Sequence, residues 1–102
     1  MKPLKRRVVQ VTFIGALRAL FNKRSDEIEV PAVFTIGDII SALSARYGDI
    51  VEYHLLDAYG RFRQNVVVLA DGARVDLQEG LCTPLTGSKK TELVVMEAIG
   101  GG

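Results

Sequence analysis

One segment near the middle of the chain restricts the fold more than any other, because it carries every signal of a helix. Thr35 is a good N-cap, since its hydroxyl can bond a free backbone N–H, and Asp38 lies at the positive end of the helix dipole. Gly48 is typical of a helix C-terminus. The sequence therefore predicts a helix over residues 36–47. Its apolar side chains recur at helical spacing and form one stripe: Ile36, Ile39, Ile40, Leu43 and Tyr47.

Strand patterns precede this helix. Residues 7–14 are rich in Val, Thr, Phe and Ile in an alternating pattern, which predicts a half-buried first strand. A short helical turn is expected at residues 16–21. A second strand is expected at Ile28 and Val30, with Val33 as a candidate third member of its apolar face. These two strands predict an N-terminal hairpin.

The second half of the chain has shorter elements. Residues 49–64 contain an Asp-Ala-Tyr-Gly turn sequence and exposed charges, and we expect a long surface loop there. Residues 66–69 are an apolar run followed by Asp-Gly, a common hairpin signal, with a further short strand at 74–77. Residues 93–99 have the composition of a buried last strand, which ends where three glycines begin. The expected order of elements is β-β-α-β-β-β.

Composition argues against several kinds of partner. Thirteen basic and twelve acidic residues give a net charge of +1, so there is no sequence-wide field for nucleic acid or for an anionic membrane. The chain contains no run of about 18 apolar residues and no apolar stretch near Met1 that would suit a secretory signal. A single cysteine allows no internal disulfide and gives no reason to expect an oxidising compartment. We therefore expect a cytoplasmic protein without nucleic-acid or membrane partners.

No side-chain active site emerges from the sequence. Cys82 is interpreted as a small buried hydrophobe and not as a sulfur-relay residue. His54 has no evident metal partner and no Ser or Cys placed as a nucleophile, so we interpret it as a surface or hydrogen-bonded histidine. The expectation is a chain with no metal site, no permanently bound cofactor and no catalytic side chain.

Three segments carry a resemblance to a known family. Residues 66–72 are an apolar strand ending in Asp-Gly, residues 80–85 read Gly-Leu-Cys-Thr-Pro-Leu, and residues 99–102 read Ile-Gly-Gly-Gly. Together with the element order, they resemble the sulfur-carrier branch of the β-grasp, or ubiquitin-like, fold. That branch includes the small subunit of molybdopterin synthase, the thiamine-pathway sulfur carrier and the archaeal ubiquitin-like modifiers. The likeness is greatest to the first and extends over nearly the whole chain, although Asp71 replaces the family's usual Asn.

The resemblance implies an α+β fold, a β-grasp roll in which a mixed sheet of four to five strands packs on one main helix. Residues 1–99 would form this single domain and residues 100–102 a flexible glycine tail. The C-terminal carboxylate of Gly102 would be adenylated with ATP by an enzyme related to ubiquitin activators, and a sulfur donor protein would then convert it to a thiocarboxylate. Gly101 and Gly100 have no Cβ to obstruct threading into a narrow catalytic tunnel.

The function implied is sulfur donation in molybdopterin synthesis, beside a larger catalytic subunit, by a chain that is itself a non-catalytic subunit of the synthase. Partner-binding residues follow from strand parity. Ile14 falls on the face opposite the apolar set of the first strand, and in the last strand one of two alternating apolar sets is surplus to a single core. We predict that Ile14, Met96 and Ile99 contact partners, with simple burial as the alternative for Met96.

Two other functions stay open. The same activated glycine could serve thiamine synthesis or tRNA thiolation, or could join a ubiquitin-like modifier to lysines. A different class of function is a non-covalent β-grasp interaction module, with an inert tail and exposed sheet edges used for pairing. Indifference to loss of Gly102 would identify this second class.

Overall fold

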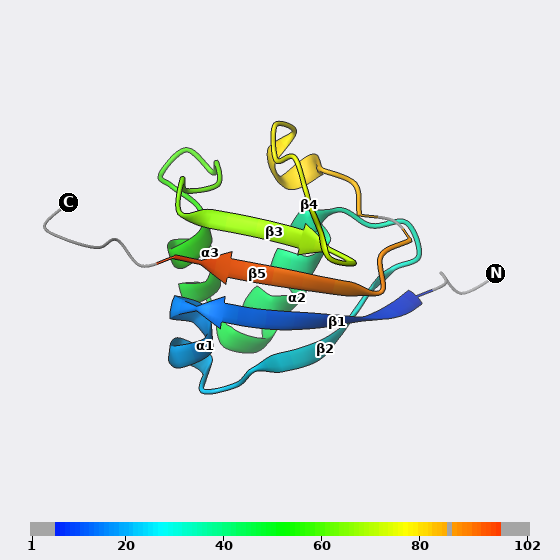
Figure 1. Ribbon diagram of the computed structural model, residues 1–102, viewed down its shortest axis with the longest axis horizontal. Helices are drawn as coiled ribbons and strands as arrows, with labels where there is room; N and C mark the ends of the chain where they lie inside the picture. Colours follow the sequence, from blue (N-terminus) through cyan, green and yellow to red (C-terminus); the bar gives the residue numbers. More distant parts are fainter. Residues whose placement is uncertain (1–5, 86, 97–102) are drawn as a thin grey trace, which may run out of the picture.

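The last strand of the chain lies in the middle of its sheet (Figure 1). The computed structural model describes residues 6–85 and 87–96. Within them the strand order is β2-β1-β5-β3-β4, in which β5 is parallel to β1 and antiparallel to β3, and the outer pairs are antiparallel. The bounds are β1 Arg6–Gly15, β2 Ser25–Pro31, β3 Val66–Ala70, β4 Ala73–Arg74 and β5 Lys90–Val95.

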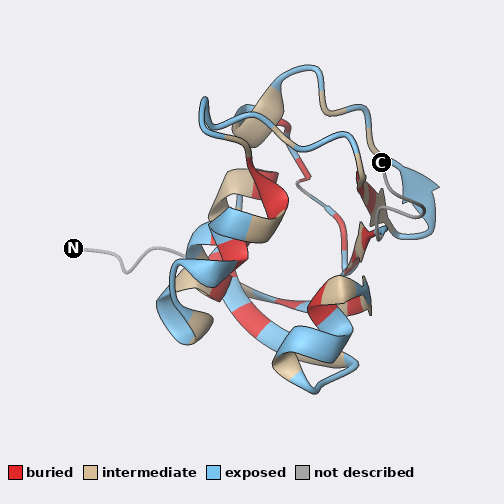
Figure 2. Ribbon diagram, turned by 90° about the vertical axis from the view of Figure 1, so that its left-hand side faces the viewer, coloured by how far each residue is buried: buried red, intermediate tan, exposed pale blue. Residues whose placement is uncertain are grey.

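One long helix covers one face of this sheet. Figure 1 shows α2 crossing behind the strands, with α1 and α3 at the end of the sheet toward which β5 points. Figure 2 shows that the buried parts of the strands and of α2 face each other. The arrangement is the predicted α+β, β-grasp fold with a mixed sheet on one main helix. The helices are α1 Ala16–Phe21, α2 Ile36–Tyr47, α3 Ile50–Leu55 and the 3₁₀ helix η1 Gly80–Cys82.

The sequence signals of α2 are realised in its contacts. The Thr35 hydroxyl accepts a hydrogen bond from the Asp38 N–H at 3.3 Å, and the Asp38 carboxylate accepts one from the Thr35 N–H at 2.8 Å. This reciprocal capping box satisfies two backbone donors at the helix start. At the other end, the Gly48 N–H donates to the Ser44 carbonyl at 2.8 Å. The predicted bounds, 36–47, are confirmed.

The core fills the space between α2 and the inner face of the sheet. Each buried aliphatic or aromatic side chain contributes about 1.5–3 kcal/mol relative to an exposed one. The predicted core residues of the first strand, Val9, Val11 and Phe13, are fully buried. They are joined by apolar side chains from the other strands and from α2: Ile28, Val30, Val66, Val68, Leu93, Val95, Ile36, Ile39, Ile40 and Leu43.

Several expectations about boundaries were wrong. Residues 49–64 are not one long loop, because α3 forms there and buries Val51 and Leu55. Val33 does not extend the second strand: β2 ends at Pro31, which has no N–H to donate, and Val33 is 78% exposed. The strand expected at 74–77 is the two-residue β4. The hairpin of β1 and β2, the short helix α1 and the strand after it were predicted correctly.

Candidate functional site at the end of the central strand

The predicted reactive group follows β5 in the sequence. Gly102, with Gly101, Gly100 and Ile99, lies outside the described residues, so the site is built from the last described position, Met96. Val95 pairs with Gly15 of β1 on one side and with Val66 of β3 on the other. The central strand therefore delivers the chain to the edge where β1 turns into α1 and β3 begins.

Gly15 permits the close packing at this edge. Its φ of +82° is in the region that favours glycine, and it precedes α1 directly. A Cβ built on Gly15 would lie 2.1 Å from the Val95 carbonyl oxygen, which is far inside van der Waals contact. The start of α1 can thus press against the end of β5 only with glycine at this position.

Asn65 bonds to both main-chain groups of Met96. The Met96 N–H donates to the Asn65 carbonyl at 2.9 Å, which extends the ladder between β5 and β3 by one pair. The Asn65 side-chain amide donates back to the Met96 carbonyl at 2.7 Å. Both main-chain groups of Met96 are therefore bonded to one partner.

Strand pairing brings apolar residues together on the outer face of the sheet. In the register, Ile14 is opposite Val94, and Val94 is opposite Val67, and all three are half-buried. Met96, two positions beyond Val94, is 49% exposed. We call Ile14, Val67, Val94 and Met96 the outer patch. The register thus places Ile14 beside Val94, and strand alternation continued by one pair puts Met96 on the same face as Val94. Burial of Met96 is excluded.

Val67 was missed by sequence reasoning, although a signal existed. The apolar run at 66–69 has alternating faces, so only half of it can reach a single core. Val66 and Val68 are buried, whereas Val67 and Leu69 are half-buried on the opposite face.

A small cavity of about 250 Å³ adjoins Met96. Its wall includes Tyr53 and His54 of α3 and the following Arg63. The Arg63 Nε donates to the Tyr53 carbonyl at 3.1 Å, and its guanidinium lies 5.8 Å from the centre of the Tyr53 ring. His54 is half-buried and its ring packs edge-on against Tyr53 at 5.3 Å. Among residues 6–85 and 87–96, no group of three His, Cys, Asp or Glu side chains could hold a metal ion.

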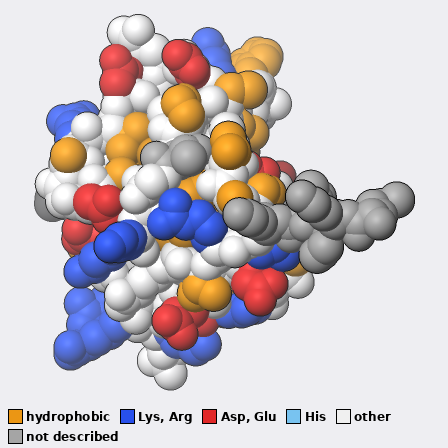
Figure 3. All heavy atoms as spheres, turned by 90° about the vertical axis from the view of Figure 1, so that its right-hand side faces the viewer, with side chains coloured by type: hydrophobic (Ala, Val, Ile, Leu, Met, Phe, Trp, Pro, Cys, Tyr) orange, Lys and Arg blue, Asp and Glu red, His pale blue; other side chains and the backbone are white. Residues whose placement is uncertain are grey.

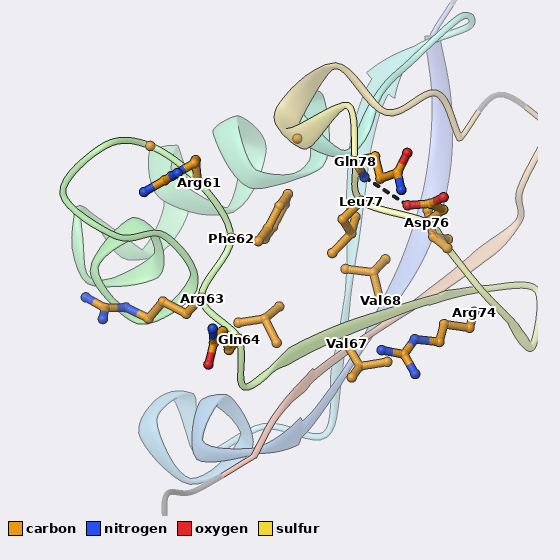
Figure 4. A pocket seen from close by; sticks show the side chains of 14 residues that line it. Arg61, Phe62, Arg63, Gln64, Val67, Val68, Arg74, Asp76, Leu77 and Gln78 are labelled. Atoms are coloured by element: carbon orange, nitrogen blue, oxygen red, sulfur yellow. Dashed lines mark hydrogen bonds between the residues drawn. The ribbon is translucent and has the colours of Figure 1, made fainter.

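A larger cavity of about 600 Å³ lies elsewhere, between the loop at 60–64 and the segment at 74–80 (Figure 4). Phe62 and Leu77 point into it above Val68 of β3, whereas Arg61 and Arg63 point away. No Ser, Thr, Cys or His is among the described residues that line it. Among the described lining residues, the cavity therefore provides no hydroxyl, thiol or imidazole side chain, and Asp76 is its one carboxylate.

Cys82 was interpreted incorrectly as a buried hydrophobe, because its side chain is exposed. The reason lies in η1, where Leu81 takes the inward position. A Cβ on Gly37 of α2 would lie 2.8 Å from the Leu81 carbonyl oxygen and 3.3 Å from the Leu81 Cβ. Helix α2 and η1 are thus in close contact through Leu81, and Cys82 is left facing outward.

Asp71 accepts hydrogen bonds from the main chain at the start of β5. Its Oδ1 accepts hydrogen bonds from the N–H groups of Lys89 and Lys90, both at 3.0 Å. These two bonds hold the pKa of Asp71 below its usual range. They fix the start of β5 beside the β3–β4 turn, and an Asn side chain offers the same acceptor oxygen.

Asp26 ties the start of β2 to the end of α2. It accepts a hydrogen bond from the Tyr47 hydroxyl and pairs with Arg46 at 2.8 Å. Burial raises the pKa of Asp26, but the hydrogen bonds from Tyr47 and Arg46 outweigh it and lower the value to about 2. Burial and the bond to Asp26 raise the pKa of Tyr47 to about 12. The cluster joins β2 to α2.

The outer edge of β2 is largely capped by side chains of the same molecule. Arg46 donates to the Glu27 carbonyl at 3.0 Å and Arg6 to the Glu29 carbonyl at 3.2 Å. Pro31 has no N–H to offer. An edge treated in this way presents few free groups to an added strand. Figure 3 shows that charges of both signs are interspersed on the side of the molecule opposite the end of β5.

The fold, a β-grasp whose last described strand lies in the middle of the sheet, is the one shared by ubiquitin-like sulfur carriers and modifiers. A sequence model described as the ThiS family matches residues 11–102. The chain belongs to the ThiS family. No curated protein matches it. No helix in the described ranges is long and apolar enough to cross a bilayer.

Solved structures share the fold at low sequence identity. Small archaeal modifier protein 1 of Haloferax volcanii matches with a TM-score of 0.73 and 17% identity, over 92% of this chain and 100% of that one. The antigen CysO of Mycobacterium tuberculosis matches with a TM-score of 0.68 and 24% identity, over 87% and 99%. A chain of the BexX/CysO complex of Amycolatopsis orientalis matches with a TM-score of 0.69 and 19% identity, over 90% and 99%.

Proposed function

We propose that this protein is a sulfur carrier whose C-terminal Gly102 carboxylate is adenylated and then thiocarboxylated, and that it donates sulfur in molybdopterin synthesis. The observation that carries the proposal is the position of β5. The central strand ends beside a partly exposed apolar patch, and the six residues after Met96 lead to the terminal carboxylate. Membership of the ThiS family supports the same reading.

The chemistry explains why a carrier needs partners. A carboxylate is a poor electrophile, because its charge is delocalised and oxide is a poor leaving group. In the proposed reaction an oxygen of the Gly102 carboxylate attacks the α-phosphorus of ATP, and pyrophosphate leaves. A sulfide equivalent from a sulfur donor protein then attacks the acyl carbon, and AMP leaves. The resulting thiocarboxylate is the nucleophile in the next step.

The short reach of the C-terminal segment requires docking of the whole domain. Six fully extended residues span at most about 22 Å, at about 3.3–3.6 Å each. Gly100 and Gly101 lack a Cβ and would fit a narrow tunnel in the activating enzyme. The domain itself must therefore bind close to the active site, and the outer patch with Ile99 is the proposed contact surface. The same surface would meet the larger synthase subunit. Because activation consumes ATP, a cytoplasmic location is part of the proposal.

The docking surface can be tested with a matched pair of variants. Met96→Asp puts a charge in the outer patch, whereas Val8→Asp puts one on the same sheet face at the far end of β1, where Val8 is 58% exposed. Central apolar contacts typically contribute about 2 kcal/mol or more to binding, or roughly 30-fold in affinity. We expect Met96→Asp to weaken binding to the activating enzyme by this factor and Val8→Asp to leave it unchanged. Equal effects would argue against the outer patch.

The reaction itself is tested by pyrophosphate exchange with the activating enzyme from the same cell. Full-length protein is expected to support exchange, and a variant lacking Gly102 is expected to support none. Intact-mass analysis of protein from its own cells should also reveal a population in which one oxygen is replaced by sulfur. Exchange that does not depend on Gly102 contradicts the proposal.

The identity of the partner distinguishes the remaining pathways. Capture of a pterin-binding large subunit supports molybdopterin synthesis, whereas a thiazole synthase or a tRNA thiolase supports another sulfur pathway. Conjugates on lysines would support a modifier. The capping of Glu27 and Glu29 on β2 gives no support to an interaction module that pairs through this edge.

A further inference from the structure

We propose that Asn65 is a positioning residue that fixes the direction in which the chain leaves the sheet and so presents the C-terminus to the activating enzyme. This inference rests on the proposed function, but its structural part can be tested without any enzyme. It begins from the two hydrogen bonds that join Asn65 to Met96, residues 31 positions apart in the sequence.

The pairing of the strands around Met96 makes Asn65 the contact that orients the Met96 backbone. On the β1 side, pairing with β5 stops at Gly15 and Val95, because the chain turns into α1 at the next residue. On the β3 side, the ladder continues for one more pair, from Asn65 to Met96. Among the described residues, the printed main-chain bonds to Met96 thus come from the β3 side, and its side chain is 49% exposed.

The side-chain hydrogen bond orients the Met96 carbonyl, whereas the main-chain hydrogen bond holds only the Met96 N–H. The Met96 N–H is bonded to the Asn65 carbonyl, which fixes the position of the Met96 amide nitrogen. The bond from the Asn65 amide to the Met96 carbonyl fixes the peptide plane that leads to residue 97. An amide supplies the donor that this bond requires, whereas a carboxylate can only accept. The orientation of the Met96 carbonyl is therefore set by the chemistry of one side chain.

The effect on the reaction should appear in binding. Without the side-chain bond, the backbone at Met96 gains conformations that must be given up when the enzyme takes the tail. The entropy cost of ordering one residue changes an equilibrium constant by about 5- to 30-fold. Once the tail is bound, the geometry between the carboxylate and ATP is the same in the Asn65 variants as in the unaltered protein. We expect the KM of the activating enzyme for this protein to rise by that factor, with kcat within about twofold.

Three variants separate the roles of the side chain. Asn65→Ala removes the amide, and Asn65→Asp keeps its size but replaces the donor by an acceptor. Gln64→Ala, at the exposed neighbouring position, is the matched control. Urea unfolding establishes that all three fold, and the exposed bond at Asn65 should affect their stability little.

The enzyme-free measurement is ¹⁵N relaxation of the backbone amides from Val95 to residue 97. Both Asn65 variants are expected to lower the order parameter at residue 97 and leave that of Val95 unchanged, and Gln64→Ala should change neither. Unchanged order in the Asn65 variants overturns the inference, whatever the enzyme does.

The kinetic measurement is pyrophosphate exchange at varied concentrations of the carrier. A higher KM in both Asn65 variants, with kcat kept and with Gln64→Ala unaffected, supports the inference. A fall in kcat at constant KM, or rescue of KM by Asn65→Asp, overturns it. If the unaltered protein supports no exchange at all, the proposed function fails, while the relaxation result still decides whether Asn65 orders the end of β5.

Discussion

Replacement of Gly15 by alanine tests the packing at the end of the central strand. Two costs are expected. A residue with a side chain at positive φ loses about 1–2 kcal/mol, and φ at Gly15 is +82°. The new Cβ would also lie 2.1 Å from the Val95 carbonyl oxygen, so the backbone of α1 or β5 must move. Overpacking of this kind costs about 1–3 kcal/mol more. The sum is about 2–5 kcal/mol, a large part of the usual stability of about 5–15 kcal/mol.

Gly60→Ala is the matched control. Gly60 also has a positive φ, of +76°, but a Cβ there would meet nothing within 4 Å. It should therefore lose only the conformational part, about 1–2 kcal/mol. Urea unfolding measures both variants. With a slope of about 1.5 kcal/mol per molar urea, Gly15→Ala should lower the midpoint by about 1–3 M. Equal losses in the two variants would refute the close approach of Gly15 to Val95.

Two further predictions concern single side chains. Tyr47→Phe removes a hydrogen bond that holds the pKa of Asp26 at about 2, so that pKa should rise toward the ordinary value of 3.8. A lowered carboxyl pKa stabilises the fold above pH 3.8, and this stability is lost as the pH falls through about 2. The variant should therefore lose about 1 kcal/mol at neutral pH and less near pH 2, measured by urea unfolding and by NMR titration of Asp26. Equal losses at both values would contradict the pairing. Because Cys82 is exposed, a thiol reagent should label the folded protein without urea, and mass spectrometry measures the labelled fraction. Labelling that occurs only after unfolding would contradict the exposure of Cys82.

Local signals made some elements predictable. The capping box of α2 joins residues three positions apart, Thr35 and Asp38, and the apolar stripe repeats within the same 12 residues. The six-residue helix α3 was missed because the turn sequence and the charges at residues 57–63, which follow it directly, indicated a loop for the whole segment. A helix of that length has little stability alone and forms because neighbouring elements cover it.

The candidate site was predictable in part. Ile14 and Met96 follow from strand parity, because side chains alternate between the two faces of any strand. Val67 and Asn65 belong to the site only because β3 lies beside β5, and no residue near them in the sequence indicates that neighbour. The outward position of Cys82 likewise depends on contact between η1 and α2.

The sequence by itself determined the main helix, the alternation of apolar and polar side chains along the strands, and the glycines after the last strand. Each of these features depends on residues a few positions apart. Tertiary structure decided that β5 lies between β1 and β3, and hence that Ile14, Val67, Val94 and Met96 share one face. The physical reason is that strand pairing across long separations is chosen by the joint burial of many side chains. No single segment contributes enough of the burial free energy for its pairing partner to be predicted from that segment alone.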